Sequence, residues 1–208
     1  AGREILRAGG GAIDAAIAAQ MVLNLVEPQS SGVGGGAFLL HYAAATGEIT
    51  AYDGRETAPK AATEDMFLAP DGAPKEFFEA AVGGLAVGVP GLIGVLELAH
   101  NDHGKLPWAR LFAPAIKLAE AGFAISPRLS RLIARDRHLK TFPEVVRYFY
   151  DADGAPKAVG AIVVNEPLAQ TFRAIAEGGA QAFYAGALAR DIAAAVRGAA
   201  DNPGRLSE

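Results

Sequence analysis

Residues 27–42 read EPQSSGVGGGAFLLHY, and this stretch decides how the fold begins. Residues 12–26, before this stretch, would form a helix with apolar side chains on nearly every face. Such a helix is expected to be buried, and Glu27-Pro28 ends it. The short apolar run after the glycines predicts a strand, because it lies between two turn signals. The sequence thus predicts, in order, a helix at 12–26, a glycine loop at 30–36, a strand at 37–42, a turn at Thr46-Gly47 and a returning strand at 49–52.

The remainder of the chain reads as mostly helical from about residue 62 to 150, with two further helices after that. Helix ends carry capping residues: Ser126-Pro127 opens one helix, and Gly122 and Gly198 close two others. We expect an α/β fold with helix in excess, forming a single partial domain over residues 1–208 whose two ends both read as cuts. The expected helices lie between Val89-Pro90-Gly91 and His103-Gly104, at 107–121, from Ser126, at 166–177 and at 187–197.

The composition indicates a folded globular protein and excludes several classes of function. The chain has 208 residues, of which 51% are hydrophobic and 20% charged, and its net charge is −4. This mild acidity gives no general attraction to nucleic acid or anionic membrane, so an anionic substrate needs a local positive group. No apolar run is long enough for a membrane span. The absence of cysteine excludes disulfides, thiolate catalysis and Cys-ligated zinc.

The glycine loop allows three interpretations. Gly32, Gly34 and Ala37 formally match the G-x-G-x-x-G/A dinucleotide pattern, which requires a strand before the loop and a helix after it. Here a predicted helix precedes the loop and a predicted strand follows, so this context argues against nucleotide binding. A tight helix-to-strand passage needs glycine for positive φ or for close backbone packing. Alternatively, the glycines let the backbone approach a neighbouring active site.

The chain offers no convincing nucleophile–base pair. Ser30 and Ser31 lack the G-x-S-x-G elbow of hydrolases. His100 and His103 have a spacing that two metal ligands use, but nothing supplies a third ligand, and cations at a helix C-terminus are the simpler reading. The other two histidines, His41 and His138, have no triad-like setting. The short acidic clusters are interpreted as solvated or capping groups; they contain Asp53, Glu56, Glu64 and Asp65.

Arg55 is the strongest candidate for ligand binding. It follows the predicted hairpin on a turn that begins with Asp53-Gly54, a place where rigid strands aim a loop side chain. A guanidinium there can hold a carboxylate through two parallel hydrogen bonds, which a lysine cannot do. The competing interpretation is a structural ion pair with Asp53 or Glu56, which on position alone is the commoner use of an arginine.

Six runs of the sequence closely resemble γ-glutamyltransferases, in the order that this family has them and over nearly the whole chain. Breadth of this kind is far more specific than any single motif. The chain is similar to the N-terminal portion of the family's large subunit. The runs are GGGAIDAAIAAQ, EPQSSGVGGGAFLLHY, DGRETAP, GGLAVGVPG, LPWARLFAPAIKLAEAGF and NEPLAQTFRAIAEGGAQAFYAG.

The resemblance implies a partial Ntn-hydrolase αββα sandwich from a precursor that cleaves itself into a large and a small subunit. The N-terminal Thr of the small subunit attacks a γ-glutamyl amide such as glutathione, and an N-terminal amine serves such a hydroxyl as base. The family anchors the donor α-carboxylate with the Arg of a D-x-R-E-x-A-P motif, which falls on Arg55 here. The resemblance also implies that the protein uses no cofactor or metal and has no nucleic-acid partner. It implies a periplasmic or secreted location, reached after an upstream leader is removed.

Two positions depart from the family pattern, and three other functions stay open. Gly11 stands where Asn is common, and Ala37 where a fourth Gly is common; Gly11 caps a helix slightly less well than Asn. One alternative is a glutaryl acylase of the cephalosporin type, whose substrate also offers a carboxylate. The others are a non-catalytic binding relative and a nucleotide-binding domain. As a separate fragment, residues 1–208 are expected to be inactive and poorly stable, because half a sandwich leaves apolar faces in water.

Overall fold

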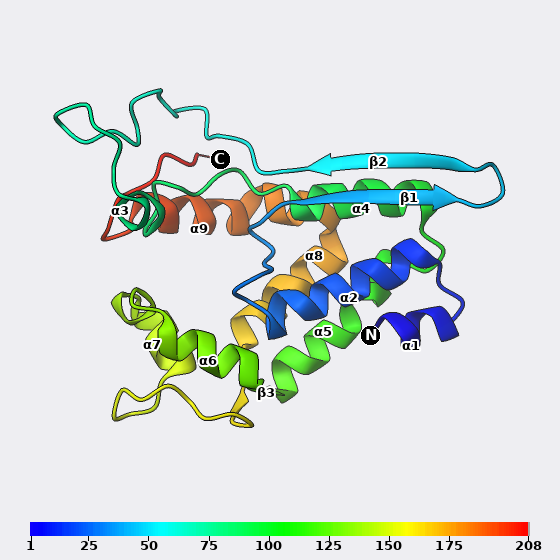
Figure 1. Ribbon diagram of the computed structural model, residues 1–208. Helices are drawn as coiled ribbons and strands as arrows, with labels where there is room; N and C mark the ends of the chain where they lie inside the picture. The colour runs from blue at the N-terminus through cyan, green and yellow to red at the C-terminus, as the bar shows by residue number, and fades with distance from the viewer. Residues whose placement is uncertain (208) are drawn as a thin grey trace. The chain divides into compact units, whose positions relative to one another are not determined.

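The computed structural model describes residues 1–207, which are rich in helix and carry two separate two-stranded sheets (Figure 1). The chain divides into two compact units, each assembled from two sequence segments. The first unit comprises Ala1–Gly32 and His100–Glu177, and the second comprises Val33–Ala99 and the described residues from Gly178 onward. The single partial domain expected over residues 1–208 therefore stays a prediction, and Glu208 lies outside the described residues.

The first unit is built around the predicted buried helix. Helix α2 has the boundaries that the sequence predicts, and it packs against α1 and α5 with one side chain of nearly every turn fully buried. Trp108, the first residue of α5, donates a hydrogen bond from its ring to the Ile175 carbonyl at 3.0 Å. The elements are α1 Gly2–Arg7, α2 Ala12–Val26, α5 Trp108–Ala121, β3 Phe123–Ala124, α6 Pro127–Arg135, η1 Leu139–Thr141, α7 Pro143–Phe149, β4 Ile162–Val163 and the first part of α8 Glu166–Tyr184.

The first unit also contains a cluster of buried apolar side chains. Ser126 caps α6 as predicted, since its hydroxyl accepts a hydrogen bond from the Leu129 backbone at 3.1 Å. Gly122 has φ 85°, which turns the chain from α5 into β3, and Phe123 then pairs with Val163 of β4. The cluster comprises Leu25, Ala119, Phe123, Ile125, Leu129, Ile133, Phe149, Tyr150, Val163 and Ala169.

The second unit begins with the predicted hairpin. Strand β1 (Ala37–Ala43) pairs antiparallel with β2 (Glu48–Gly54), in a register that joins Ala37 to Gly54. Helix α4 (Leu92–His103) begins in this unit, and α3 (Phe77–Ala81) and α9 (Gly186–Arg197) belong to it. The hairpin confirms the two strands that the sequence predicts, and the side chains of β1 alternate between exposed and partly buried positions.

Helix α8 continues beyond its predicted end. The sequence predicted a stop at Glu177, and the backbone does leave the helical region at Gly179, which has φ 65° and ψ −161°. The helix then resumes because Glu97 of α4 supplies an acceptor: its Oε1 atom receives a hydrogen bond from the Ala180 backbone at 2.7 Å. This capping contact joins residues 83 positions apart, so local sequence patterns gave no sign of it.

The chain between β2 and α3 contains less helix than the sequence predicts. Residues 57–76 form turns and isolated bridges, where the sequence had suggested helix from about residue 62. None of the helices between residues 1 and 207 combines the length and apolar character needed to cross a membrane.

Candidate functional site

Arg55 directly follows β2, and close backbone contacts fix this end of the hairpin. A side chain on Gly54 would lie 2.5 Å from Val95 of α4, and one on Gly91 would lie 2.1 Å from the Gly54 carbonyl. Both distances are far below normal contact, so the two backbones approach as only glycine permits. Asp53 Oδ1 accepts a hydrogen bond from the Arg55 backbone N–H at 2.9 Å, which shapes the turn. The start of the Arg55 side chain is therefore held by rigid elements.

The glycine loop contributes to the same support. The Gly35 carbonyl accepts hydrogen bonds from the backbone N–H groups of Gly91 and Leu92, both at 3.0 Å, at the start of α4. A side chain on Gly36 would lie 2.5 Å from the Gly54 carbonyl and 2.6 Å from Glu56 Oε2. The sequence left two reasons for glycine in this helix-to-strand loop, positive φ and close backbone packing. Positive φ occurs at none of Gly32, Gly34, Gly35 and Gly36, so close backbone packing is the reason. The loop runs from α2 into β1, opposite to the order that dinucleotide binding requires.

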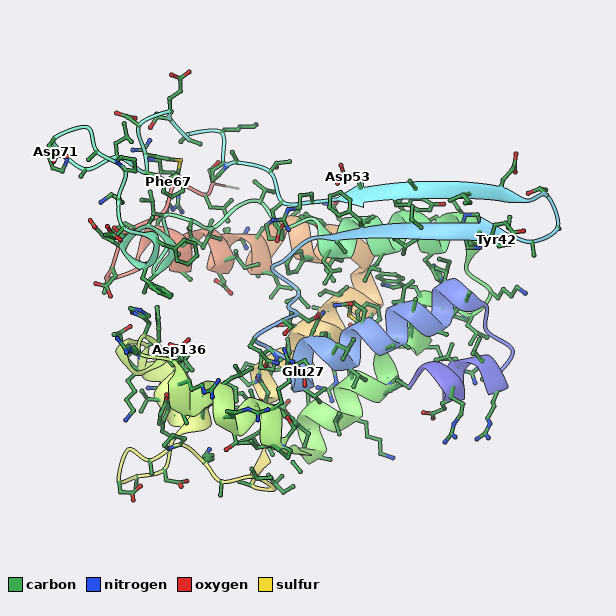
Figure 2. All side chains as sticks on the ribbon, in the orientation of Figure 1. Glu27, Tyr42, Asp53, Phe67, Asp71 and Asp136 are labelled. Carbon is green, nitrogen blue, oxygen red and sulfur yellow. The ribbon has the colours of Figure 1, made fainter. Side chains whose placement is uncertain are left out.

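Arg55 lines a cavity of about 460 Å³ in the second unit. One wall is formed by the residues after Arg55, and the backbone of Thr57 pairs there with Val89 through hydrogen bonds of 2.8 and 3.4 Å. Apolar side chains line another part of the cavity. Figure 2 shows Asp53 at the end of β2 and Phe67 on the long excursion that follows. The lining residues are Gly34, Arg55, Glu56, Thr57, Ala58, Pro59, Met66, Phe67, Leu85, Ala86, Val87 and Gly88.

The Arg55 guanidinium is exposed and carries one ion pair. Its Nη1 atom lies 3.1 Å from Glu56 Oε2, and the Arg55 side chain is 67% exposed. An ion pair this exposed contributes no more than about 1 kcal/mol to stability, because water and salt screen it. A guanidinium has five N–H donors, so most of them remain available to a ligand. The structural ion pair and the binding role are therefore compatible.

The acidic residues near Arg55 have structural contacts. Asp53 shapes the turn, and Glu56 pairs with Arg55 while its carboxylate packs against Gly36. A hydrogen bond from Thr63 is the main cause that lowers the pKa of Asp65, and its own backbone N–H and the Arg205 charge lower it further. Asp53 accepts the Arg55 backbone N–H, as expected of a capping group, and Glu56 forms the ion pair with Arg55 that the sequence left open.

The serines and histidines considered from the sequence lie in other settings. In the first unit, the Ser31 hydroxyl donates to Asn24 Oδ1 at 2.5 Å, and Ser30 lies 3.5 Å from Arg128. His100 Nε2 lies 2.8 Å from the Leu106 carbonyl, near the end of α4. Within residues 1–207, no group of three or more His, Cys, Asp or Glu side chains is arranged to hold a metal ion.

Sequence reasoning missed the apolar side of the cavity. Met66 and Phe67 lie in a stretch that was expected to be helical, and nothing local shows that it folds back beside Arg55. Residues 85–88 were noted as part of the run GGLAVGVPG, without a role. The next residue, Val89, forms an isolated bridge with Thr57, and this bridge brings residues 85–88 beside the residues that follow Arg55.

A family model described as Gamma-glutamyltranspeptidase matches residues 1–207. The chain belongs to this family. It is 40% identical over 196 residues to the glutathione hydrolase proenzyme of Bacillus subtilis (strain 168), covering 94% of this chain and 33% of that protein. This γ-glutamyltranspeptidase chain therefore spans about a third of the length of the curated relatives it matches.

Solved structures agree with this assignment. The crystal structure of Helicobacter pylori γ-glutamyltranspeptidase matches with a TM-score of 0.92 and 34% identity, covering 99% of this chain and 58% of that one. A cephalosporin acylase from Bacillus halodurans matches with a TM-score of 0.82 and 33% identity, covering 99% of this chain and 38% of that one. The predicted α/β fold of the Ntn-hydrolase type, rich in helix, is thereby confirmed.

Proposed function

We propose that this chain is the donor-anchoring portion of an enzyme that transfers the γ-glutamyl group. The donor is glutathione or another γ-glutamyl amide, and the acceptor is water, an amino acid or a peptide. In this proposal a Thr of a small subunit from the same precursor forms the acyl-enzyme, and Arg55 binds the donor's α-carboxylate. An anchored carboxylate places the γ-carbonyl where the nucleophile can reach it, which converts a bimolecular encounter into an oriented reaction.

The observation that carries the proposal is the exposed Arg55 guanidinium lining a 460 Å³ cavity, in a chain of this family. The protein's overall charge is negative, so a local cation is needed to attract an anionic donor. A planar guanidinium matches a carboxylate with two parallel charge-assisted hydrogen bonds. The base of the side chain is fixed by the turn hydrogen bond of Asp53, which reduces the cost of ordering Arg55 on binding.

The small subunit is the partner that we propose for the hairpin. Phe38, Leu40, Tyr42 and Ile49 are between 62% and 73% exposed, and the first three occupy alternate positions of β1. Tyr42 and Ile49 pair across the strands, so these side chains share one face. A contiguous apolar face of this kind is covered in a finished protein. Relatives named proenzymes support a partner cut from the same precursor. The periplasmic or secreted location stays a prediction.

A glutaryl acylase is the second candidate. The structural match to the Bacillus halodurans cephalosporin acylase favours it. A glutaryl group offers Arg55 the same carboxylate but has no α-amino group, so the two candidates predict the same anchor and different donors. Assaying the complete enzyme side by side with glutathione and with a glutaryl amide separates them.

The test of the anchor is kinetic, in the complete enzyme with a γ-glutamyl anilide as donor. Removing one partner of a charged hydrogen-bonded pair costs about 2–5 kcal/mol, so Arg55→Ala is expected to lower kcat/KM by about 30-fold or more. Arg55→Lys keeps the charge but loses the two-pronged geometry, so it is expected to recover only a small part of this loss.

The matched control is Arg190→Ala, which removes an exposed arginine of α9 from the same unit. This control is expected to keep wild-type kinetics. The anchoring role is refuted if Arg55→Ala retains both kcat and KM while the wild-type enzyme is active. A wild-type enzyme that hydrolyses the glutaryl amide and not glutathione replaces the first candidate by the second.

A further inference from the structure

The apolar side of the cavity belongs to a long excursion, residues 60–82, which we call the wall segment. It leaves the Arg55 motif after Pro59 and places Met66 and Phe67 on the cavity. Its only helix among the described residues is α3, which has five residues. The rest is held by local turns and by one bridge between Leu68 and Pro74. A segment with so little regular structure needs outside contacts to keep one conformation.

The first outside contact is made by Arg205. Its Nη1 atom donates hydrogen bonds to the Ala61 carbonyl at 3.1 Å and to Thr63 Oγ1 at 2.8 Å. Thr63 in turn is the hydrogen-bond partner that lowers the pKa of Asp65. One nitrogen thus fixes the backbone a few residues before Met66 and Phe67.

The second outside contact is made by Asp201 and Asn202 at the other end of the wall segment. Asn202 Nδ2 donates to the Val82 carbonyl at 3.0 Å and to the Glu79 carbonyl at 2.5 Å, which satisfies the end of α3. Asn202 has φ 45°, and no other non-glycine residue of the described chain has positive φ. A side chain on Gly83 would lie 1.9 Å from the Asp201 carbonyl. Residues 201–205, the clasp, therefore hold both ends of the wall segment.

We propose that Met66 and Phe67 form a specificity wall that contacts an apolar or aromatic leaving group of the donor, and that Arg205 is its positioning residue. This inference rests on the proposed function, because Arg55 must anchor the carboxylate for the leaving group to reach the wall. The cavity is lined by the Arg55 cation, by the Glu56 carboxylate that pairs with it, and by apolar side chains that include Met66 and Phe67. It can therefore take a molecule that carries both a carboxylate and an apolar group. Phe67 is 41% exposed without a ligand and has area left to bury.

The chemistry at Arg205 differs from that at Arg55 in a way that an experiment can use. A single nitrogen of Arg205 makes both hydrogen bonds, and its acceptors are a neutral carbonyl and a hydroxyl. A lysine ammonium carries three donors on one nitrogen, so Arg205→Lys is expected to restore the clasp. By contrast, the anchoring role of Arg55 depends on the two-pronged guanidinium and is not restored by lysine.

The experiment uses the complete enzyme and two donors that share the γ-glutamyl group, the anilide and the methylamide. For Arg205→Ala and for Phe67→Ala, the ratio of the anilide KM to the methylamide KM is expected to rise about tenfold, which is the size of an apolar contact in a pocket. Values of kcat for the two donors are expected to change in parallel. Arg205→Lys is expected to return the ratio to within about twofold of wild type, and Arg190→Ala serves as the control.

The outcomes separate this inference from the proposed function. A wild-type enzyme that turns over neither donor contradicts the proposed function. The inference that Met66 and Phe67 form a specificity wall is then refuted as well. If wild type turns over both donors and the variants raise both KM values equally, the anchor stands and the specificity wall is refuted. If thermal unfolding shows that Arg205→Ala does not fold, Phe67→Ala decides the matter, because its side chain is exposed.

Discussion

Asp14 is the residue whose environment differs most from what its position suggests. It lies in the first turn of α2, where a negative charge suits the helix dipole, yet its side chain is fully buried. Its carboxylate accepts hydrogen bonds from the backbone N–H groups of Gly11 at 2.7 Å, Lys105 at 3.0 Å and Leu106 at 3.3 Å. Asp14 therefore joins the start of α2 to the connection between α4 and α5.

Replacing Asp14 by Ala is expected to lower the free energy of unfolding by about 3 kcal/mol, because three backbone donors around a buried carboxylate lose their acceptor. Urea unfolding of the complete protein at neutral pH measures this change. Asp191→Ala, which removes an exposed carboxylate from α9, is the matched control and is expected to have little effect. A loss below about 1 kcal/mol for Asp14→Ala shows that water satisfies these donors instead.

The two sides of the cavity differ in how well the sequence could predict them. Arg55 was identified because its motif is local: a hairpin end, a glycine and an arginine within three residues. Met66 and Phe67 were not identified, because their position depends on the clasp at residues 201–205, more than 130 positions away. Hydrogen bonds to backbone carbonyls leave no signature in the acceptor's sequence, since every residue has a carbonyl.

At the scale of elements, the contact between the end of β2 and the start of α4 places Arg55. The hairpin, α2 and α5 were predicted because their apolar runs and the residues that end them are local in the sequence, and their observed bounds agree to within a residue or two. The restart of α8 at Ala180 was missed, because the Glu97 acceptor comes from a different helix. The same holds for the Gly35 carbonyl that accepts the first N–H groups of α4.

Gly54→Ala is expected to displace the end of β2, because its new side chain would lie 2.5 Å from Val95. A shift of the Arg55 backbone misplaces the donor, so we expect KM for a γ-glutamyl anilide to rise about tenfold, with a fall of several degrees in Tm. Gly32→Ala is the control, since nothing lies within 4 Å of the added carbon. Equal kinetics for the two variants contradict the view that this contact sets the position of Arg55.

At the scale of the whole molecule, the exposed face of the hairpin is the surface that we propose a small subunit covers. Four large apolar side chains of β1 and β2 lie open to water, although the sequence has ample apolar residues to form cores elsewhere. The sequence predicted the strands as short apolar runs between turn signals and left both faces of the hairpin unassigned. Local patterns show that a strand forms, but they do not show which of its faces a partner would cover.

Residues 1–208 expressed alone are expected to be inactive and poorly stable, with the hairpin face exposed. Binding of a hydrophobic dye and a broad, non-cooperative urea transition are the expected signs, and Leu40→Lys, on that face, is expected to reduce dye binding. The complete protein is expected to bind far less dye. A fragment that unfolds cooperatively as a soluble monomer contradicts this expectation.

We propose that the Arg55 guanidinium binds the donor's α-carboxylate. A comparison of two donors, with and without this carboxylate, in two forms of the enzyme tests this role. The complete wild-type enzyme and Arg55→Ala are each assayed with a γ-glutamyl anilide and with its α-carboxamide analogue. We predict that wild type prefers the carboxylate donor by about 100-fold in kcat/KM, and that Arg55→Ala loses this preference almost entirely. An Arg55→Ala enzyme that still prefers the carboxylate donor as strongly as wild type would show that another group holds it.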